Sequence, residues 1–265
     1  MTRSASIGSA PPPTHPPLAR LPGLPGLPGA PSLSIDQLLD LGRSNAAGIW
    51  PLGRELSRGR NHHLTNRASE LRDALAGTCD WYEVDVRRIR GELVASHDPT
   101  PALDALRMRD WIRIVAAARR GIKLDFKERD AIAPTLDLVR AAGVPDERLI
   151  INVRVLDPRR GGLDAAHLRR IRARFPRATV NLSLGDGNLT PARLRAAVEL
   201  AHTVGGPIAF PLELSRITRD VVATLRASGG SVAAWNDPRR SPVDDRSRTR
   251  RELRALGVDG MLDLR

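Results

Sequence analysis

The sequence of 265 residues is poor in cysteine, aromatic residues and lysine, and it lacks any long apolar run. The single cysteine, Cys79, excludes an intrachain disulfide and a zinc site built from several thiolates. Aromatic residues make up 3%, so the core must consist mainly of Leu, Val, Ile and Ala. No segment approaches the ~20 consecutive apolar residues that cross a bilayer, and no signal-peptide core follows Arg3. We therefore expect a soluble, cytoplasmic protein without a transmembrane segment.

Positive charge is carried almost entirely by arginine. Lys and Arg together number 42 against 30 Asp and Glu, for a formal net charge of +12, yet Lys123 and Lys127 are the only lysines. This balance raises nucleic acid or an anionic surface as a partner. We do not favour nucleic acid, because the arginines rarely alternate with the aromatic residues that a stacking platform needs. Two lysines four residues apart instead indicate a place where a compact ammonium group is required.

The chain divides by composition into a tail and one domain. Residues 1–33 are rich in Pro, Gly, Ala and Ser, and they contain a period-three Leu-Pro-Gly run that is too short for a collagen triple helix. We predict a disordered tail there and a single domain over residues 34–265. An apolar content of 41% is sufficient for a real core. Ser34 and Gln37 have the spacing of a capping box, which predicts a short helix at the start of the domain.

Beyond residue 60, short apolar runs alternate with amphipathic stretches, and Gly or Pro occupies many of the joints. We expect a first strand that ends at His63 and further strands at Trp81–Ile89, Leu93–Ser96, Ile122–Phe126, Leu149–Val153, Thr179–Leu184, Ile208–Pro211, Ser231–Ala234 and Gly257–Leu262. Helices are expected at Arg67–Ala76, Ala102–Arg119, Asp130–Ala142, Asp164–Arg174, Pro191–Val204, Thr218–Ala227 and Ser247–Leu256. Eight strand–helix steps in about 230 residues predict an α/β fold of the TIM (β/α)8 type. A doubly wound open sheet is the alternative, but no Gly-rich phosphate turn follows the first strand.

Three carboxylates lie on two neighbouring predicted strands. Glu83 and Asp85 are two residues apart and therefore share one face of their strand, and Asp125 lies on the next strand. If this face points into a barrel, the acids are buried together unless a cation neutralises them. A hard divalent ion such as Mg²⁺ or Ca²⁺ prefers such oxygen ligands. We predict a metal site of Glu83, Asp85 and Asp125; the alternative is a solvated acidic pair on an edge strand.

The two lysines flank Asp125 at two residues on either side, so all three share one strand face. Alternating charge inside a barrel is too costly for core packing. We interpret it as a polar site in which Lys127, assisted by Lys123, offers positive charge to a phosphoryl oxygen. The alternative places the three residues on the outer face as ion pairs.

Two histidines stand at the ends of predicted strands, His63 after the first and His97 directly before Asp98-Pro99. Two imidazoles that face a phosphate can act as general base and general acid, although His62 competes with His63 for this role. In a barrel, the C-terminal ends of the strands form one active-site mouth. The candidate substrate-binding residues at that mouth are Asn66, Lys123, Asn152 and Trp235.

Several of these segments resemble known phosphodiesterases. Trp81–Val86 and Gly91–Asp98 are similar to the metal strand and the following His-Asp turn of glycerophosphodiester phosphodiesterases. The run Gly121–Lys127, together with His63-x-x-Asn66 and Glu83-x-Asp85, resembles the menorin family within the same phospholipase-C-like superfamily. The first strand lacks the His-Arg-Gly pattern of the glycerophosphodiesterases proper. The resemblance covers about residue 60 to the C-terminus, and it implies a TIM barrel with phosphodiesterase chemistry.

Three functions follow from these observations. We favour a metal-dependent phosphodiester hydrolase whose substrate is a small phosphodiester or a lysophospholipid-type molecule. The first alternative is a non-catalytic ligand-binding barrel of the menorin type. The second is a basic protein that binds nucleic acid or an anionic surface, and it predicts an affinity that falls steeply with salt.

Overall fold

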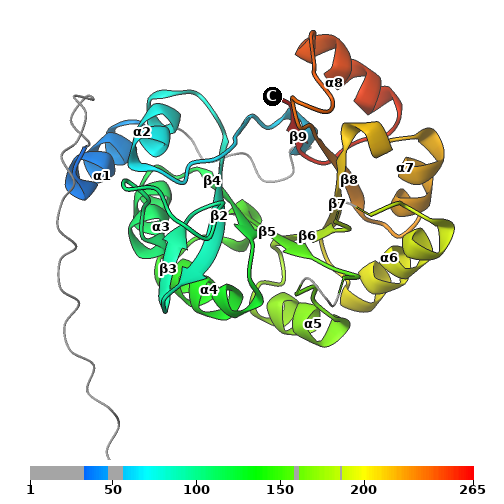
Figure 1. The fold of residues 1–265 in the computed structure, drawn as a ribbon, viewed down its shortest axis with the longest axis horizontal. Coiled ribbons are helices and arrows are strands. Elements are labelled where there is room, and N and C mark those ends of the chain that lie inside the picture. Colours follow the sequence, from blue (N-terminus) through cyan, green and yellow to red (C-terminus); the bar gives the residue numbers. More distant parts are fainter. Residues whose placement is uncertain (1–32, 47–55, 158–160, 186) are drawn as a thin grey trace, which may run out of the picture. The chain divides into compact units, whose positions relative to one another are not determined.

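The computed structural model describes residues 33–46, 56–157, 161–185 and 187–265. Residues 34–46 and the later ranges form the predicted α/β barrel, in which eight parallel strands pair in sequence order (Figure 1). All but the last residue of the predicted disordered tail lie outside the described residues. The predicted boundary between tail and barrel therefore stays a prediction.

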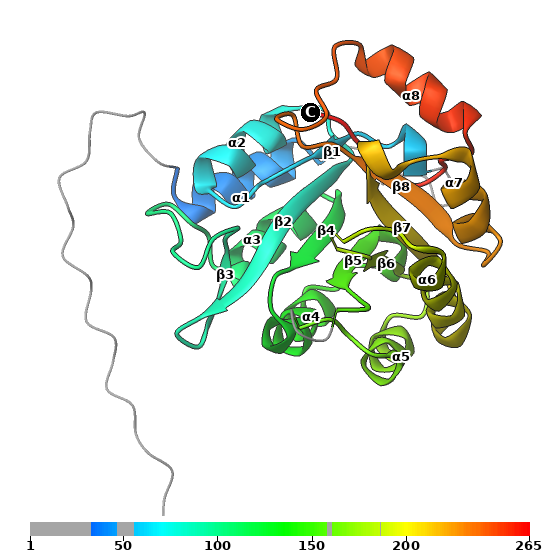
Figure 2. The same cartoon turned by 45° about the vertical axis from the view of Figure 1, so that its right-hand side comes forward.

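The barrel is built from neighbouring parallel strands that follow one another in the chain. They are β1 (Asn61–His62), β2 (Trp81–Ile89), β4 (Gly121–Phe126), β5 (Leu149–Arg154), β6 (Thr179–Ser183), β7 (Ile208–Glu213), β8 (Ser231–Trp235) and β9 (Leu262–Asp263). The remaining strand, β3 (Glu92–Ala95), pairs in antiparallel fashion with the second half of β2. Figure 2 shows that this β2–β3 hairpin projects beyond the other strands.

Helices connect the strands and cover the outside of the barrel (Figures 1 and 2). They are α2 (Ala68–Ala76), α3 (Met108–Ala117), α4 (Ile132–Ala141), α5 (Ala165–Arg174), α6 (Pro191–Val204), α7 (Arg219–Arg226) and α8 (Arg246–Ala255). A further helix, α1 (Ile35–Ser44), packs on α2 and α3 and begins with the predicted capping box of Ser34 and Gln37. Within the described ranges, no helix combines the length and the apolar character that a membrane crossing requires.

Two predicted elements begin five or more residues later than expected. Helix α3 starts at Met108 rather than Ala102, because Ala105 and Arg107 form isolated β-bridges with Arg67 and Val94. The last strand is Leu262–Asp263 rather than Gly257–Leu262. Gly257 has a φ of 92°, and the Gly260 N–H donates to the Val232 carbonyl at 2.8 Å, so residues 257–260 form a turn against β8.

Side chains at alternate strand positions fill the barrel in layers. Trp81, Ile150, Ala233 and Met261 pack together as an apolar plug at the N-terminal end of the strands. Two residues further along β2 and β4, Glu83 stands beside Lys123 and then Asp85 beside Asp125 in the parallel register. The plug closes one end of the barrel, and the polar layers above it face the C-terminal ends of the strands.

Gly121 makes room for the largest side chain of the plug. A Cβ atom at Gly121 would lie 2.3 Å from ring atoms of Trp81, whereas a Cβ at Gly77 would come no closer than 3.3 Å to its neighbours. We expect Gly121→Ala to lower the free energy of unfolding by about 1–3 kcal/mol, the usual cost of overpacking a core. Urea unfolding measures this change, with Gly77→Ala as the control.

The clash also predicts a coupling between the two residues. In a Trp81→Leu background the ring is gone, so Gly121→Ala should cost clearly less than it does in the wild type. An equal cost in both backgrounds would show that the steric explanation is wrong.

Candidate functional site

A cavity of about 550 Å³ opens at the C-terminal ends of the strands. It is lined by residues from all eight parallel strands or the loops that follow them. Nine of the predicted site residues lie on its wall: His63, Glu83, Asp85, His97, Lys123, Asp125, Lys127, Asn152 and Trp235. The fold therefore brings together residues that are far apart in the sequence.

The three predicted metal ligands converge at the centre of this cavity. Glu83, Asp85 and Asp125 each offer one carboxylate oxygen, and these three atoms lie within 4.8 Å of one another. Glu83 and Asp85 are each only 1% exposed. Their grouping follows from the local structure, because β2 presents Glu83 and Asp85 on one face and pairs Asp85 with Asp125 of β4.

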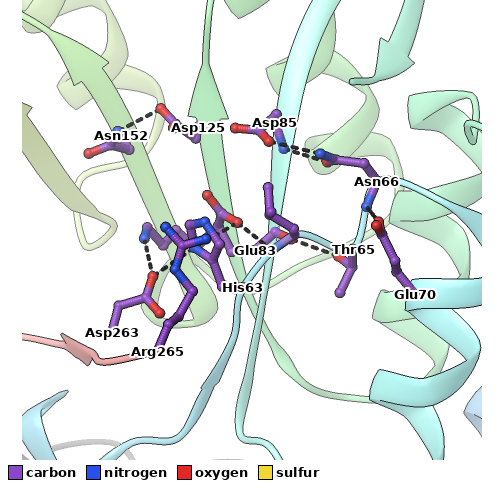
Figure 3. A network of polar contacts seen from close by, with 12 residues as sticks. His63, Thr65, Asn66, Glu70, Glu83, Asp85, Asp125, Asn152, Asp263 and Arg265 are labelled. Atoms are coloured by element: carbon purple, nitrogen blue, oxygen red, sulfur yellow. Dashed lines mark hydrogen bonds and ion pairs between the residues drawn. The ribbon is translucent and has the colours of Figure 1, made fainter. Parts of the chain in front are cut away.

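Lys127 and Asn152 hold two of these carboxylates in place. The Lys127 Nζ lies 2.6 Å from Asp85 Oδ1 and 2.7 Å from Asp125 Oδ2. Asn152 Nδ2 donates to Asp125 Oδ1 at 2.6 Å (Figure 3). Burial would raise the pKa of Asp125, but Lys127 and the Asn152 amide outweigh it and hold that pKa below its usual value. Burial would lower the pKa of Lys127, but the two carboxylates raise it instead.

The donor set fits a hard divalent cation. Four carboxylates, those of Glu83, Asp85, Asp125 and Asp263, share the cavity floor with the two ammonium groups of Lys123 and Lys127. Burial raises the pKa of Glu83 even though His63 and Lys123 lie beside it. Oxygen ligands of this kind suit Mg²⁺ and Ca²⁺.

His63, which directly follows β1, is held by two carboxylates, one from β9 and one from β2. Its Nδ1 lies 2.8 Å from Asp263 Oδ2 and 3.3 Å from Glu83 Oε2 (Figure 3). Burial would lower the pKa of His63, but Glu83 and Asp263 outweigh it and raise that pKa. Lys123 approaches the same Asp263 oxygen at 3.5 Å. Because Nδ1 is engaged, Nε2 is the ring nitrogen that can serve a ligand in the cavity.

The loop after β1 is bonded closely to β2. The Leu64 N–H donates to Glu83 Oε2 at 2.8 Å, and Leu64 has a φ of 60°, a left-handed conformation that is rare for leucine. Thr65 Oγ1 donates to the Glu83 carbonyl at 2.7 Å. Both polar atoms of the Asn66 side chain bond to Asp85. Asn66 Nδ2 donates to Asp85 Oδ2 at 2.8 Å, and Asn66 Oδ1 accepts from the Asp85 backbone N–H at 2.9 Å. The structure thus puts Asn66 behind Asp85, outside the wall of the main cavity, where it orients a carboxylate.

His97 lies at the rim of the cavity, in the loop between β3 and α3. Its side chain is 63% exposed, and its Nδ1 lies 2.9 Å from Asp98 Oδ1. Arg87 Nε donates to the His97 carbonyl at 2.9 Å, so the backbone of the loop is attached to the barrel. His62 does not line the cavity, and burial lowers its pKa. Of the two adjacent histidines, His63 is the one that faces the site.

Sequence reasoning did not assign a site role to several polar residues of the cavity wall, among them Arg154, Asp263 and Arg265. Arg154 follows Asn152 by two residues on β5, so the alternation of that strand could have identified it. Asp263 and Arg265 continue the inward face that begins with Met261. They were missed because the last strand was expected to start five residues and to end one residue too early.

Solved structures share this fold. A glycerophosphoryl diester phosphodiesterase from Parabacteroides distasonis matches at a TM-score of 0.51 and 14% identity, over 88% of this chain and 88% of that chain. A provisionally assigned glycerophosphoryl diester phosphodiesterase from Silicibacter pomeroyi matches at 0.54 and 15%, over 79% and 92%. Another from Galdieria sulphuraria matches at 0.52 and 14%, over 77% and 92%. At these identities the likeness establishes the fold alone.

The family of this chain is established by its amino-acid sequence, which matches a protein-family model. The family model of the menorin N-terminal domain matches residues 57–226, which is more than half of the chain and includes β1 through α7. This range contains Glu83, Asp85 and Asp125, both lysines and both candidate catalytic histidines, so the resemblance inferred from these segments is confirmed. The chain belongs to the menorin family.

Proposed function

We propose that this protein is a metal-dependent phosphodiester hydrolase that acts on a small phosphodiester or a lysophospholipid-type molecule. The observation that carries the proposal is the group of Glu83, Asp85 and Asp125, whose oxygens lie within 4.8 Å of one another on the floor of an open cavity. Phosphodiester hydrolysis is also the activity named for the structural neighbours.

Glu83, Asp85 and Asp125 would hold Mg²⁺ or Ca²⁺. A bound divalent cation supplies Lewis-acid stabilisation to the negative charge of a reacting phosphoryl group. Lys127 adds a fixed positive charge next to two of the ligands, and Lys123 adds one beside His63. Both ammonium groups are buried among carboxylates, so they stay charged at neutral pH.

His63 and His97 exchange protons with the two oxygens that change partners at phosphorus. One imidazole takes the proton from the attacking oxygen, and the other gives a proton to the oxygen of the leaving alcohol. Asp263 holds His63 through Nδ1, which leaves Nε2 for the reacting oxygen. Asn152 orients the site through Asp125, and Trp235 forms a wall for the organic part of the substrate.

The test is hydrolysis of bis(p-nitrophenyl) phosphate, a panel of glycerophosphodiesters and a panel of lysophospholipids. Each substrate is incubated with the full chain in Mg²⁺, Ca²⁺, Mn²⁺ or EDTA. We expect turnover with at least one divalent ion and none in EDTA. Turnover that persists unchanged in EDTA would contradict the metal site.

A non-catalytic binding barrel is the second candidate, and one contact favours it. Lys127 already bridges Asp85 and Asp125 at 2.6 and 2.7 Å, so these two acids have a cationic partner within the protein. This candidate predicts no hydrolysis with any ion, together with ligand binding that does not require metal. The same assay panel, followed by calorimetric titration with phosphate in EDTA, separates the two functions.

A further inference from the structure

The inward face of β5 ends in a guanidinium group that has no side-chain partner among the described residues. Ile150, Asn152 and Arg154 alternate with buried Ile151 and Val153, and Asn152 and Arg154 both line the cavity. Arg154 makes no side-chain hydrogen bond and no ion pair with any part of the chain that the structure describes. A half-buried charge without a counter-ion is costly to keep, so its position calls for an anion from outside the protein.

The acids of the cavity cannot supply that counter-ion, because other cations already engage them. Asp85 and Asp125 pair with Lys127, and Asp263 pairs with Lys123. Glu128 pairs with Arg87 at 2.6 Å and also accepts the Arg88 N–H. Glu83, the remaining acid of the lining, lies beside His63 and belongs to the proposed metal site. The positive charge on the β5 side of the cavity is therefore left over for a ligand.

Two further polar side chains, from β6 and from the loop after β4, line the same cavity as Arg154. Ser183 is its register partner on β6 and also lines the cavity. Arg129, in the loop after β4, donates to the Gly162 carbonyl at 3.0 Å and also lines the cavity. Two guanidinium groups and a hydroxyl group are all hydrogen-bond donors, and guanidinium matches the geometry of phosphate oxygens.

We propose that Arg154, Arg129 and Ser183 form a second phosphate subsite, which binds a phosphate group carried by the alcohol part of the substrate. This proposal rests on the proposed function, since it takes the diester to lie at Glu83, Asp85 and Asp125. Arg154 stands two residues beyond Asn152, the register partner of Asp125, and two residues of strand span about 7 Å. The substrate class is then a phosphodiester with a second phosphate a few atoms away, in contrast to one with a cationic choline-type headgroup.

The experiment compares two probes that differ by one phosphate, 1,3-propanediol monophosphate and 1,3-propanediol bisphosphate. Calorimetry on the full chain with Mg²⁺ measures both affinities and needs no turnover. We expect the bisphosphate to bind about tenfold more tightly to the wild type, the usual effect of a charge-assisted hydrogen bond. Arg154→Gln should remove this advantage and leave the monophosphate affinity unchanged, while Arg154→Lys should retain part of it.

Controls keep the result specific. Arg195→Gln, on the exposed face of α6, makes the same change in charge away from the cavity and should alter neither affinity. Thermal unfolding should give Arg154→Gln a melting temperature no lower than that of the wild type, because no described intramolecular contact of that side chain is lost and an uncompensated charge is removed. Equal affinities of the two probes in the wild type, or no binding of either, would overturn the subsite. An equal loss of both affinities in Arg154→Gln would also overturn it.

The two proposals fail separately. If the bisphosphate preference depends on Arg154 but no diester is hydrolysed with any ion, the subsite stands and the catalytic proposal is wrong. If diesters are hydrolysed in a metal-dependent reaction and Arg154→Gln has no effect on either probe, the catalytic proposal stands and the subsite is wrong.

Discussion

Asp85→Asn is expected to reduce metal-dependent hydrolysis by about three orders of magnitude while leaving the barrel folded. Asparagine has the shape of aspartate, and its side-chain oxygen can still accept the hydrogen bond that Asn66 Nδ2 donates at 2.8 Å. The change removes a charged ligand from the group of Glu83, Asp85 and Asp125. A metal ion contributes several kcal/mol to the transition state, and each 1.36 kcal/mol is a factor of ten in rate, so kcat/KM should fall about a thousandfold.

Metal binding can be followed in the same variant without any substrate. A ligand that binds only the folded state raises the melting temperature, so Mg²⁺ or Ca²⁺ should stabilise the wild type and not Asp85→Asn. Asp137→Asn, on the exposed side of α4, is the matched control and should behave as the wild type. If Asp85→Asn loses activity but keeps the full thermal shift with metal, Asp85 acts through Lys127 and is not a ligand.

The barrel could be predicted because its strands are short and buried on both faces. Runs such as Leu149–Val153 and Ile208–Pro211 are nearly continuous in apolar residues, and the helices between the strands have amphipathic spacing. The last strand could not be located in this way. Val258 is as fully buried in its turn as Leu262 is in β9, so apolar content alone did not separate turn from strand. The deciding fact is that Gly260 approaches the backbone of β8, a contact made only in the folded chain.

The grouping of Glu83, Asp85 and Asp125 could be predicted from local strand geometry. The contacts that other side chains make with the residues of this site could not be predicted in the same way. Glu83 and Asp85 share a face by alternation, and Asp125 joins them through the pairing of adjacent strands. The alternation of side chains along the strand also predicts that Lys127 and Asp125 share one face. It does not predict that the Lys127 ammonium group contacts Asp85 as well. The contact between His63 and Asp263 joins residues 200 positions apart. Only the folded barrel brings the first and last strands close enough for it to form.

That contact leads to the second large effect that we expect. Asp263 Oδ2 lies 2.8 Å from His63 Nδ1 and holds one tautomer, with the proton on Nδ1 and Nε2 directed to the reacting oxygen. An asparagine amide can donate to Nδ1 instead, which stabilises the opposite tautomer. General acid–base catalysis contributes about 10²–10⁴-fold, and we expect kcat to fall within this range for His63→Ala and for Asp263→Asn, with KM little changed.

The two losses should not add, because Asp263 acts through His63 as a positioning residue. The double variant should be no slower than His63→Ala alone, and steady-state kinetics of the three variants in saturating metal measures this. Thermal shifts with metal distinguish positioning from ligation, because Asp263→Asn should keep the stabilisation that Asp85→Asn loses. Additive losses, or a loss of metal binding in Asp263→Asn, would contradict the positioning role and would make Asp263 part of the metal site.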